Sequence, residues 1–267
     1  MTATTTTTTA TTRAGAAALR SVGIGLVLLL LLAGAAGVVA QFFTQRTDGT
    51  TTITEPVTRL IVRTDTGDVR VRQSAAGTPV QVHRTLHWAF REPRTSVEAG
   101  NGLLTVVGSC DDAWWLAWCD TDFEILLPPG VALDLTTNTG DIRASASAAV
   151  AAHTDTGNIT LTAPGAPTVD ARTNTGDVVV TGGSAGASVR AQSDVGSVNL
   201  TLAEPPALAR ALADTGDVTV TVPGGTGYHV VATSDTGDTR VSVPDDGSSP
   251  RTVEARADTG NVVVRAG

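Results

Sequence analysis

The sequence predicts an all-β protein, a β-solenoid (β-helix) of about eight two-strand coils with a strand-rich N-terminal cap, preceded by one transmembrane helix. Three observations lead to this prediction. One short turn built around glycine recurs eight times, the residues on both sides of it alternate between apolar and polar, and aromatic residues make up only 3% of the 267 residues. A core without rings has to be built from small aliphatic residues, which suits a stack of narrow coils.

The N-terminal residues predict export from the cytoplasm. Residues 1–20 are rich in Thr and Ala and carry Arg13 and Arg20 but no acid, and residues 22–40 have no polar side chain. As a helix, that apolar stretch would be about 28 Å long, close to the thickness of a bilayer core. Because the arginines precede it, we assign 1–20 to a cytoplasmic tail, 21–43 to a transmembrane helix and 44–56 to a linker, and we place the rest outside the cytoplasm.

A cleaved secretory signal is the alternative for the same segment. Val38 and Ala40 put small residues at the −3 and −1 positions before Gln41, as signal peptidase requires. Cleavage after Ala40 would make the protein secreted rather than anchored in the cell membrane. Both interpretations export residues 41–267.

Residues 57–133 predict the first coil followed by the N-terminal cap. The first copy of the turn, around Gly67, is followed by a stretch that interrupts the repeat, with strand-like runs at 80–88, 96–99, 103–107 and 123–127. Six of the nine aromatic residues lie between Trp88 and Phe123. A solenoid needs a cap to cover its open end, and this stretch has the bulk for a thicker local core.

Inside the predicted cap, Cys110 and Cys119 enclose a loop with three tryptophans. In an exported domain, two cysteines between two strand-like runs favour a disulfide that staples a hairpin loop, and a zinc site would need two more ligands. Trp114, Trp115 and Trp118 are the candidate binding residues, because exposed indole rings stack on sugars, enter membrane interfaces or dock on partners. The alternative is that they pack as the core of the cap.

Residues 134–267 hold the regular repeats. The turn glycines, including the one in the first coil, are Gly67, Gly140, Gly157, Gly176, Gly196, Gly216, Gly237 and Gly260. Asp or Asn two residues before each glycine suits an Asx-turn, and glycine supplies a positive φ. The units could form either a solenoid or a meander of antiparallel hairpins. Their nearly constant spacing and small inward residues favour the solenoid.

The acidic turns invite two chemical interpretations besides a structural one. Asp-Thr-Gly is also the catalytic triplet of aspartic proteases, but those enzymes need a single facing pair, whereas here five copies alternate with Asn-Thr-Gly at Asn138 and Asn174. Stacked carboxylates could bind Ca²⁺ or could cap backbone N–H groups. The spacing does not match the glycine-rich Ca²⁺-binding nonapeptide, so we assign no metal and no cofactor.

The last repeat ends close to the C-terminus without an obvious cap. After Val264 only Arg265, Ala266 and Gly267 remain, and Arg256 and Arg265 are the charges that guard this strand. We therefore expect the C-terminal strand edge to pair with another chain, either a second copy or a partner.

The order of these segments resembles the bacterial putative adhesin family. The resemblance rests on an N-terminal membrane segment, a strand-rich stretch with a cysteine pair, the run LLPPGVALDLTTNTGDI, and serial Thr/Ser–Gly–Asp–Val repeats over residues 55–267. It implies an exported domain of β-strand repeats without a catalytic signature. The composition, rich in Ala, Thr and Gly with arginine as the only long basic residue, is similar to that of actinobacterial proteins.

The net charge and the motifs limit the classes of function that the protein can have. A net charge of −8 argues against nucleic-acid binding, which needs clustered cations. We expect a membrane-anchored, extracytoplasmic, non-catalytic module for adhesin-like binding or envelope scaffolding, with a cell-wall glycan or an envelope protein as partner. The alternative is a carbohydrate-active β-helix that acts on envelope polysaccharide, since such enzymes use the same fold. These coils lack the loop insertions that build a substrate groove.

Overall fold

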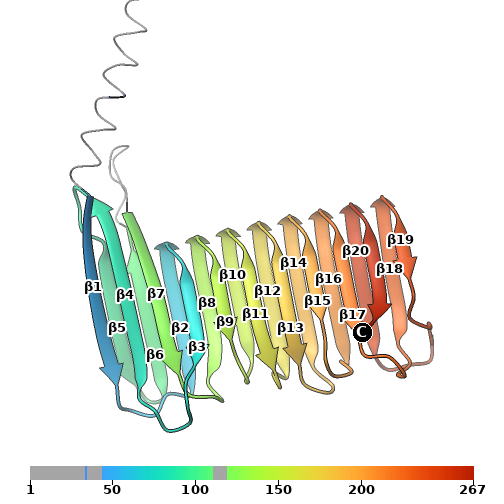
Figure 1. The fold of residues 1–267 in the computed structure, drawn as a ribbon, viewed down its shortest axis with the longest axis horizontal. Coiled ribbons are helices and arrows are strands. Elements are labelled where there is room, and N and C mark those ends of the chain that lie inside the picture. Colours follow the sequence, from blue (N-terminus) through green and yellow to red (C-terminus); the bar gives the residue numbers. More distant parts are fainter. Residues whose placement is uncertain (1–33, 35–43, 111–118) are drawn as a thin grey trace, which may run out of the picture. The chain divides into compact units, whose positions relative to one another are not determined.

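The computed structural model describes residue 34 and residues 44–110 and 119–267, and it divides into the units Met1–Thr44 and Gln45–Gly267. The predicted tail, the predicted transmembrane segment apart from Gly34, and the three loop tryptophans lie outside the described residues. Among the residues that are described, no helix is long and apolar enough to cross a membrane. The unit Gln45–Gly267 consists of two β-sheets (Figure 1).

Sheet A has eleven strands. Their spatial order is β1 (Thr44–Ile53), β4 (Val80–Ala89), β7 (Cys119–Leu127), β3 (Val69–Gln73), β9 (Ile142–Ser145), β11 (Ile159–Pro164), β13 (Val178–Gly183), β15 (Val198–Thr201), β17 (Val218–Val222), β21 (Val262–Ala266) and β19 (Thr239–Val241). Sheet B has ten strands, in the order β18 (His229–Thr236), β20 (Thr252–Thr259), β16 (Leu208–Thr215), β14 (Ser188–Val195), β12 (Thr168–Thr175), β10 (Val150–Thr156), β8 (Ala132–Thr139), β2 (Arg59–Thr66), β6 (Leu103–Ser109) and β5 (Arg94–Gly100).

Successive coils stack in parallel, which confirms a solenoid-like repeat and rules out the antiparallel meander. Each coil places one strand in sheet B and the next in sheet A, and equivalent residues face each other, as in Val150↔Val169 and Ile159↔Val178. Among the described residues there are nine such coils rather than eight. The additional one is β6–β7, which is parallel to β2–β3 but has the disulfide loop in place of the glycine turn.

The core lies between the two sheets and is lined by the alternating residues that the sequence predicts. Two and four residues after each turn glycine, apolar side chains such as Ile159 and Leu161 are buried in seven of the eight repeats. The exception is the coil β18–β19, where Thr239 and Val241 are exposed. This coil has a neighbour on one side only, so its inward face is covered only in part, at Val230 and Ala232 of β18.

The turn glycines stack in a column that accepts no other residue. All eight have φ between +130° and +147°, a region that residues with a Cβ rarely adopt. A Cβ built on Gly157 would lie 2.0 Å from the carbonyl oxygen of Gly140 in the neighbouring coil, and Gly176 meets Gly157 in the same way. The repeated glycine is therefore required both by backbone conformation and by close approach of the coils.

In most coils, side chains on both sides of the turn glycine bond one coil to the next. The hydroxyl three residues before the glycine donates to the glycine carbonyl of the neighbouring coil, as Thr173 does to Gly157 (2.9 Å). The residue after the glycine accepts the backbone N–H of its counterpart in the next coil, as Asp177 does from Ser197 (2.7 Å). Six bonds of the second kind join Asp68, Asp141, Asn158, Asp177 and Ser197, and then Asp217, Asn261 and Asp238. A seventh runs from the Asp68 N–H to Asp122, its counterpart in the coil without a glycine turn. These bonds confirm backbone capping by the residue after the glycine. The predicted Asx-turn at the residue two before the glycine is wrong, because the glycine N–H donates to the neighbouring coil instead, as Gly157 does to the Thr175 carbonyl (2.8 Å).

At the N-terminal end, the structure corrects the predicted linker. Most of residues 44–56 form β1, an edge strand of sheet A, because a Thr-rich, β-branched segment has a high strand propensity and finds a partner in β4. The antiparallel strands β4 and β5 then cover β7 and β6. Trp88 and Phe123 are buried at this end.

At the other end, the predicted C-terminal strand edge does not exist. The last coil lies inside the stack, because β20 pairs with both β16 and β18, and β21 pairs with both β17 and β19. The edge strands at this end are β18 and β19, from the preceding repeat. The chain thus passes beyond the next coil position and then returns to fill it with the last repeat.

Candidate functional site

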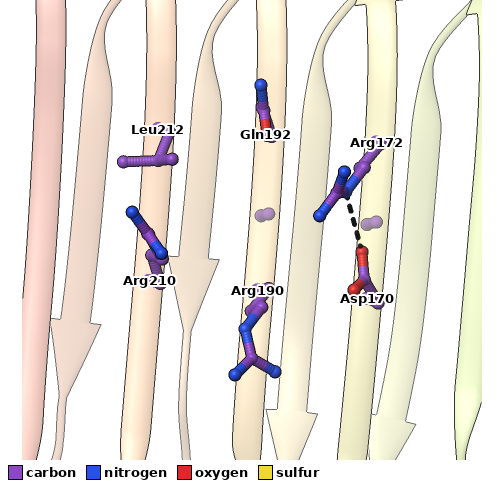
Figure 2. Close-up of a pocket in the computed structure, with 8 residues that line it drawn as sticks. Asp170, Arg172, Arg190, Gln192, Arg210 and Leu212 are labelled. Carbon is purple, nitrogen blue, oxygen red and sulfur yellow. Dashed lines mark hydrogen bonds and ion pairs between the residues drawn. The ribbon is translucent and has the colours of Figure 1, made fainter.

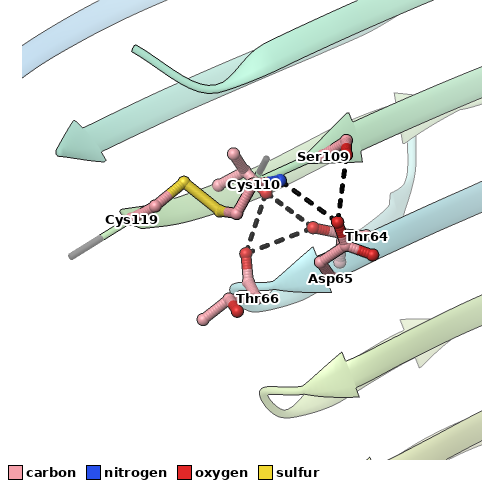
Figure 3. The surroundings of a disulfide bond; sticks show 7 residues. Thr64, Asp65, Thr66, Ser109, Cys110 and Cys119 are labelled. Carbon is pink, nitrogen blue, oxygen red and sulfur yellow. Dashed lines mark hydrogen bonds between the residues drawn. A yellow bond between two sulfur atoms is a disulfide. The ribbon is translucent and has the colours of Figure 1, made fainter. Parts of the chain in front are cut away.

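The predicted disulfide is present between Cys110 and Cys119. It closes the loop that connects β6 to β7, and its base is fixed to the first glycine turn (Figure 3). The carboxylate of Asp65 accepts hydrogen bonds from the Ser109 hydroxyl and from the Cys110 backbone N–H, each at 3.1 Å. An Asp-Thr-Gly residue thus serves as an anchor for the loop. Trp114, Trp115 and Trp118 of this loop lie outside the described residues, so their role as binding residues stays a prediction.

A second candidate lies on the outer face of sheet B, where arginines from three neighbouring strands line one hollow. The register places Arg190 of β14 directly opposite Arg210 of β16 and beside Asp170 of β12. Arg172 stands two residues further along β12, on the same face. We call Arg172, Arg190 and Arg210 the arginine cluster; Figure 2 shows it with Asp170, Gln192 and Leu212 around a shallow hollow of about 190 Å³.

The arginine cluster holds more positive than negative charge. Arg172 pairs with Asp170 (3.3 Å) and Arg210 pairs with Glu254 (3.2 Å). Arg190 donates to the hydroxyl of Ser188 (3.0 Å), and among the described residues no carboxylate lies within 4.0 Å of its guanidinium. Like charges on directly opposite residues of a sheet destabilise it. A guanidinium donates in a planar fork that fits carboxylate, phosphate or sulfate groups. This hollow is therefore suited to a bound anion.

Sequence reasoning missed the arginine cluster, although a signal for it was present. Asp170, Arg190 and Arg210 each stand six residues before a turn glycine, at the same outward position of successive repeats. Once coils stack in parallel, equal positions become neighbours. An alignment of the repeats, read position by position, predicts the juxtaposition.

A third polar cluster lies on sheet A beside the disulfide. His87 of β4 stands opposite Asp120 of β7, and Asp122 follows on the same face. One ligand atom from each of the three side chains can be chosen so that all lie within 4.8 Å of one another. Burial, together with the nearby charges of Asp122 and Asp68, raises the pKa of the Asp120 carboxyl above its usual range. Neither carboxylate was singled out from the sequence, because this cluster depends on the antiparallel register of β4 and β7.

Comparison with known proteins identifies the family. Residues 57–266 match the family described as Toastrack DUF4097. The chain belongs to the Toastrack DUF4097 family. This agrees with the resemblance seen in the sequence, to a family of β-strand-repeat domains. No curated protein is significantly similar in sequence.

Three solved structures are similar to this Toastrack domain. The first is a putative cell adhesion protein from Clostridium sporogenes, with 10% sequence identity and a TM-score of 0.42 over 84% of this chain and 100% of that chain. The second is a putative adhesin from Bacteroides fragilis, with 12% identity and a TM-score of 0.49 over 83% of this chain and 97% of that chain. The third is a putative adhesin from Parabacteroides merdae, with 11% identity and a TM-score of 0.37 over 84% of this chain and 96% of that chain. At this level of similarity we take nothing further from them for the present chain.

Proposed function

We propose that this Toastrack domain is a non-catalytic, adhesin-like binding module that holds an anionic envelope polymer on the outer face of sheet B. The observation that carries the proposal is the pair Arg190 and Arg210, placed opposite each other with a hydroxyl as the hydrogen-bond partner of Arg190. A regular face of parallel strands, about 4.8 Å apart, offers a polymer an extended surface. Repeated carboxylate or phosphate groups would bind the guanidinium groups in place of water.

Binding of soluble polymers to the full-length protein tests this proposal. We expect polygalacturonate and a glycerol phosphate polymer to be retained more strongly than neutral dextran, with affinity falling as salt is added. Stronger binding of polygalacturonate would indicate that the site recognises carboxylate groups, and stronger binding of the glycerol phosphate polymer would indicate that it recognises phosphate groups. The double variant Arg190→Ala/Arg210→Ala should weaken binding about tenfold or more, because charged hydrogen bonds contribute about 1.5–3 kcal/mol each.

The control removes a single positive charge from the other sheet. Arg143 on sheet A pairs with Asp141 (2.7 Å), and its side chain is as exposed as that of Arg210, 48% against 44%. Arg143→Ala should bind anionic polymer like the wild type. Equal binding of dextran, or equal loss in Arg143→Ala, would contradict the proposal.

The proposed location follows from the N-terminal residues. We place the module outside the cytoplasm, anchored by residues 21–43 with the N-terminus inside, because an uncharged stretch at 22–40 follows two arginines. Cell fractionation combined with intact mass tests this. An anchored protein remains in the membrane fraction with its N-terminal residues, whereas a secreted chain that begins at Gln41 would show a cleaved signal.

A further inference from the structure

The polar cluster beside the disulfide has the composition and placement of a metal site. The register sets His87 directly opposite Asp120 across the antiparallel pair β4–β7, and Asp122 lies two residues along on the same outward face. All three side chains are half-buried. Their candidate ligand atoms lie within 4.8 Å of one another, so three donors converge on one small volume.

We propose that His87, Asp120 and Asp122 bind a divalent transition-metal ion, with Zn²⁺ as the best match. Zn²⁺ takes imidazole nitrogen at about 2.0–2.1 Å and carboxylate oxygen at about 2.0–2.2 Å. In the tetrahedral arrangement of Zn²⁺ two such donors lie about 3.4 Å apart. Small side-chain rotations would bring the three groups from their present separations to that geometry. Ca²⁺ fits less well, because it prefers six to eight oxygen ligands.

The surroundings favour a cation over a bare cluster. Asp68 lies nearby and already pairs with Arg70 (2.6 Å) and Arg143 (3.8 Å), so the carboxylates open to an ion are those of Asp120 and Asp122. The Asp68 backbone N–H donates to Oδ1 of Asp122 (2.7 Å), which fixes the orientation of that carboxylate as outer-shell hydrogen bonds do for metal ligands. The antiparallel ladder between β4 and β7 holds the donors on a rigid base, and the disulfide ties the start of β7 to Cys110 at the end of β6.

A bound ion would join β4 to β7 at the base of the disulfide loop. Three protein ligands leave one position of a tetrahedral ion for water. The site is separate from the arginine cluster, which lies on the other sheet, so its existence does not depend on the proposed polymer binding.

Calorimetric titration of the full-length, EDTA-treated protein with Zn²⁺ tests the proposal. We expect one equivalent to bind, a higher melting temperature with Zn²⁺, and little change with Ca²⁺. Asp120→Asn and His87→Ala should each weaken binding by at least about tenfold.

His83→Ala is the matched control. His83 lies on the same strand but contacts Thr50 (Nδ1 to Oγ1, 3.0 Å) instead of the cluster. It should bind Zn²⁺ like the wild type. Circular dichroism identifies variants that fail to fold. If His87→Ala does not fold, Asp120→Asn, whose side chain has the same shape as the native one, provides the test. Absence of binding in the wild type, or binding that survives in a folded His87→Ala or Asp120→Asn variant, would overturn the proposal.

Discussion

At the scale of single residues, the glycine column limits what the sequence can change. Gly157→Ala would place a methyl group against the Gly140 carbonyl oxygen while keeping φ at +147°. We expect a loss of about 3 kcal/mol or more in the free energy of unfolding. Gly165 has φ +77° but nothing within 4 Å of its added Cβ, so Gly165→Ala should cost only about 1–2 kcal/mol. Urea unfolding of both variants measures the difference, and equal losses would contradict a role for close approach.

Two repeats lack the hydroxyl that bonds to the neighbouring turn. Ala213 occupies the position of Ser193, whose hydroxyl donates to the Gly176 carbonyl at 2.8 Å. Ala213→Ser should therefore donate to Gly196 and stabilise the fold by about 1 kcal/mol. Ala211 is buried two residues earlier in the apolar core, and Ala211→Ser should instead destabilise by about 1–3 kcal/mol. Thermal melting compares the two, and a destabilising Ala213→Ser would show that the hydroxyl is not needed there.

Tyr228 is the only tyrosine, so its ionisation can be followed by absorbance. It is fully buried, and its hydroxyl donates to the Pro223 carbonyl (3.0 Å). Burial raises the pKa of Tyr228 above its usual value of 10.0. The folded protein therefore favours the neutral phenol. The corresponding stability is complete below about pH 10 and is lost as pH rises through the folded-state pKa.

Substitution isolates this contribution. Tyr228→Phe should cost about 1 kcal/mol at neutral pH through the lost hydrogen bond, and should make stability less sensitive to pH above 10. Unfolding curves at pH 7 and at alkaline pH measure both effects. A tyrosinate transition at or below pH 10 in the folded protein would contradict the prediction.

At the scale of elements, coils are joined by hydrogen bonds as well as by apolar packing. Asp177 accepts the N–H of Ser197, and its own N–H donates to Asn158. Asp177→Ala removes the acceptor and should destabilise by about 1 kcal/mol or more. Asp177→Asn keeps a side-chain oxygen, as Asn158 and Asn261 do in other coils, and should be nearly neutral. Equal destabilisation by both substitutions would show that the negative charge matters and not the hydrogen bond.

The coils were predictable from sequence because only glycine fits the central position of the repeated turn. A glycine at φ near +145° followed by alternating Val and Ile fixes turn, phase and inward face together, so residues such as Val178 and Val180 were correctly placed in the core. The order of coils at the ends was not predicted. Ala209, Val230 and Val253 occupy the same phase in three repeats, and the distinguishing residue is Thr239, which takes the place of an inward Val or Ile in the repeat that ends the stack.

The two candidate sites also differ in whether the sequence could predict them. Neighbours within the regular stack, such as Arg190 and Arg210, follow from repeat position and were available to sequence reasoning. His87 and Asp120 meet only because β4 runs antiparallel to β7. That register is set outside the repeats, by the strands next to the disulfide loop, where no periodic signal exists.

At the scale of the Gln45–Gly267 unit, the two ends are closed differently. Antiparallel strands cover the N-terminal end, whereas β18 and β19 at the other end each pair on one side only. Val231 and Val241 are exposed there, and the Val230 N–H is capped by the carboxylate of Asp245 (2.9 Å). A side-chain cap on an edge strand removes a donor that another chain could use. The end coil is therefore held in place mainly by the last coil, β20–β21.

Truncation after Pro250 tests that dependence. It deletes β20 and β21, the strands with which β18 and β19 pair. We expect the amides of residues 229–241 to lose protection from hydrogen exchange, while those of β8 to β15 keep theirs, because stability in stacked repeats comes from nearest neighbours. The control is removal of Gly267 alone. This deletion removes one hydrogen bond, from the Gly267 N–H to the Val222 carbonyl (2.9 Å), and should leave hydrogen exchange at residues 229–241 unchanged. Persistent protection at 229–241 in the truncated protein would mean that the end coil moves onto β16–β17, which its similar turn chemistry would permit, and would contradict the prediction.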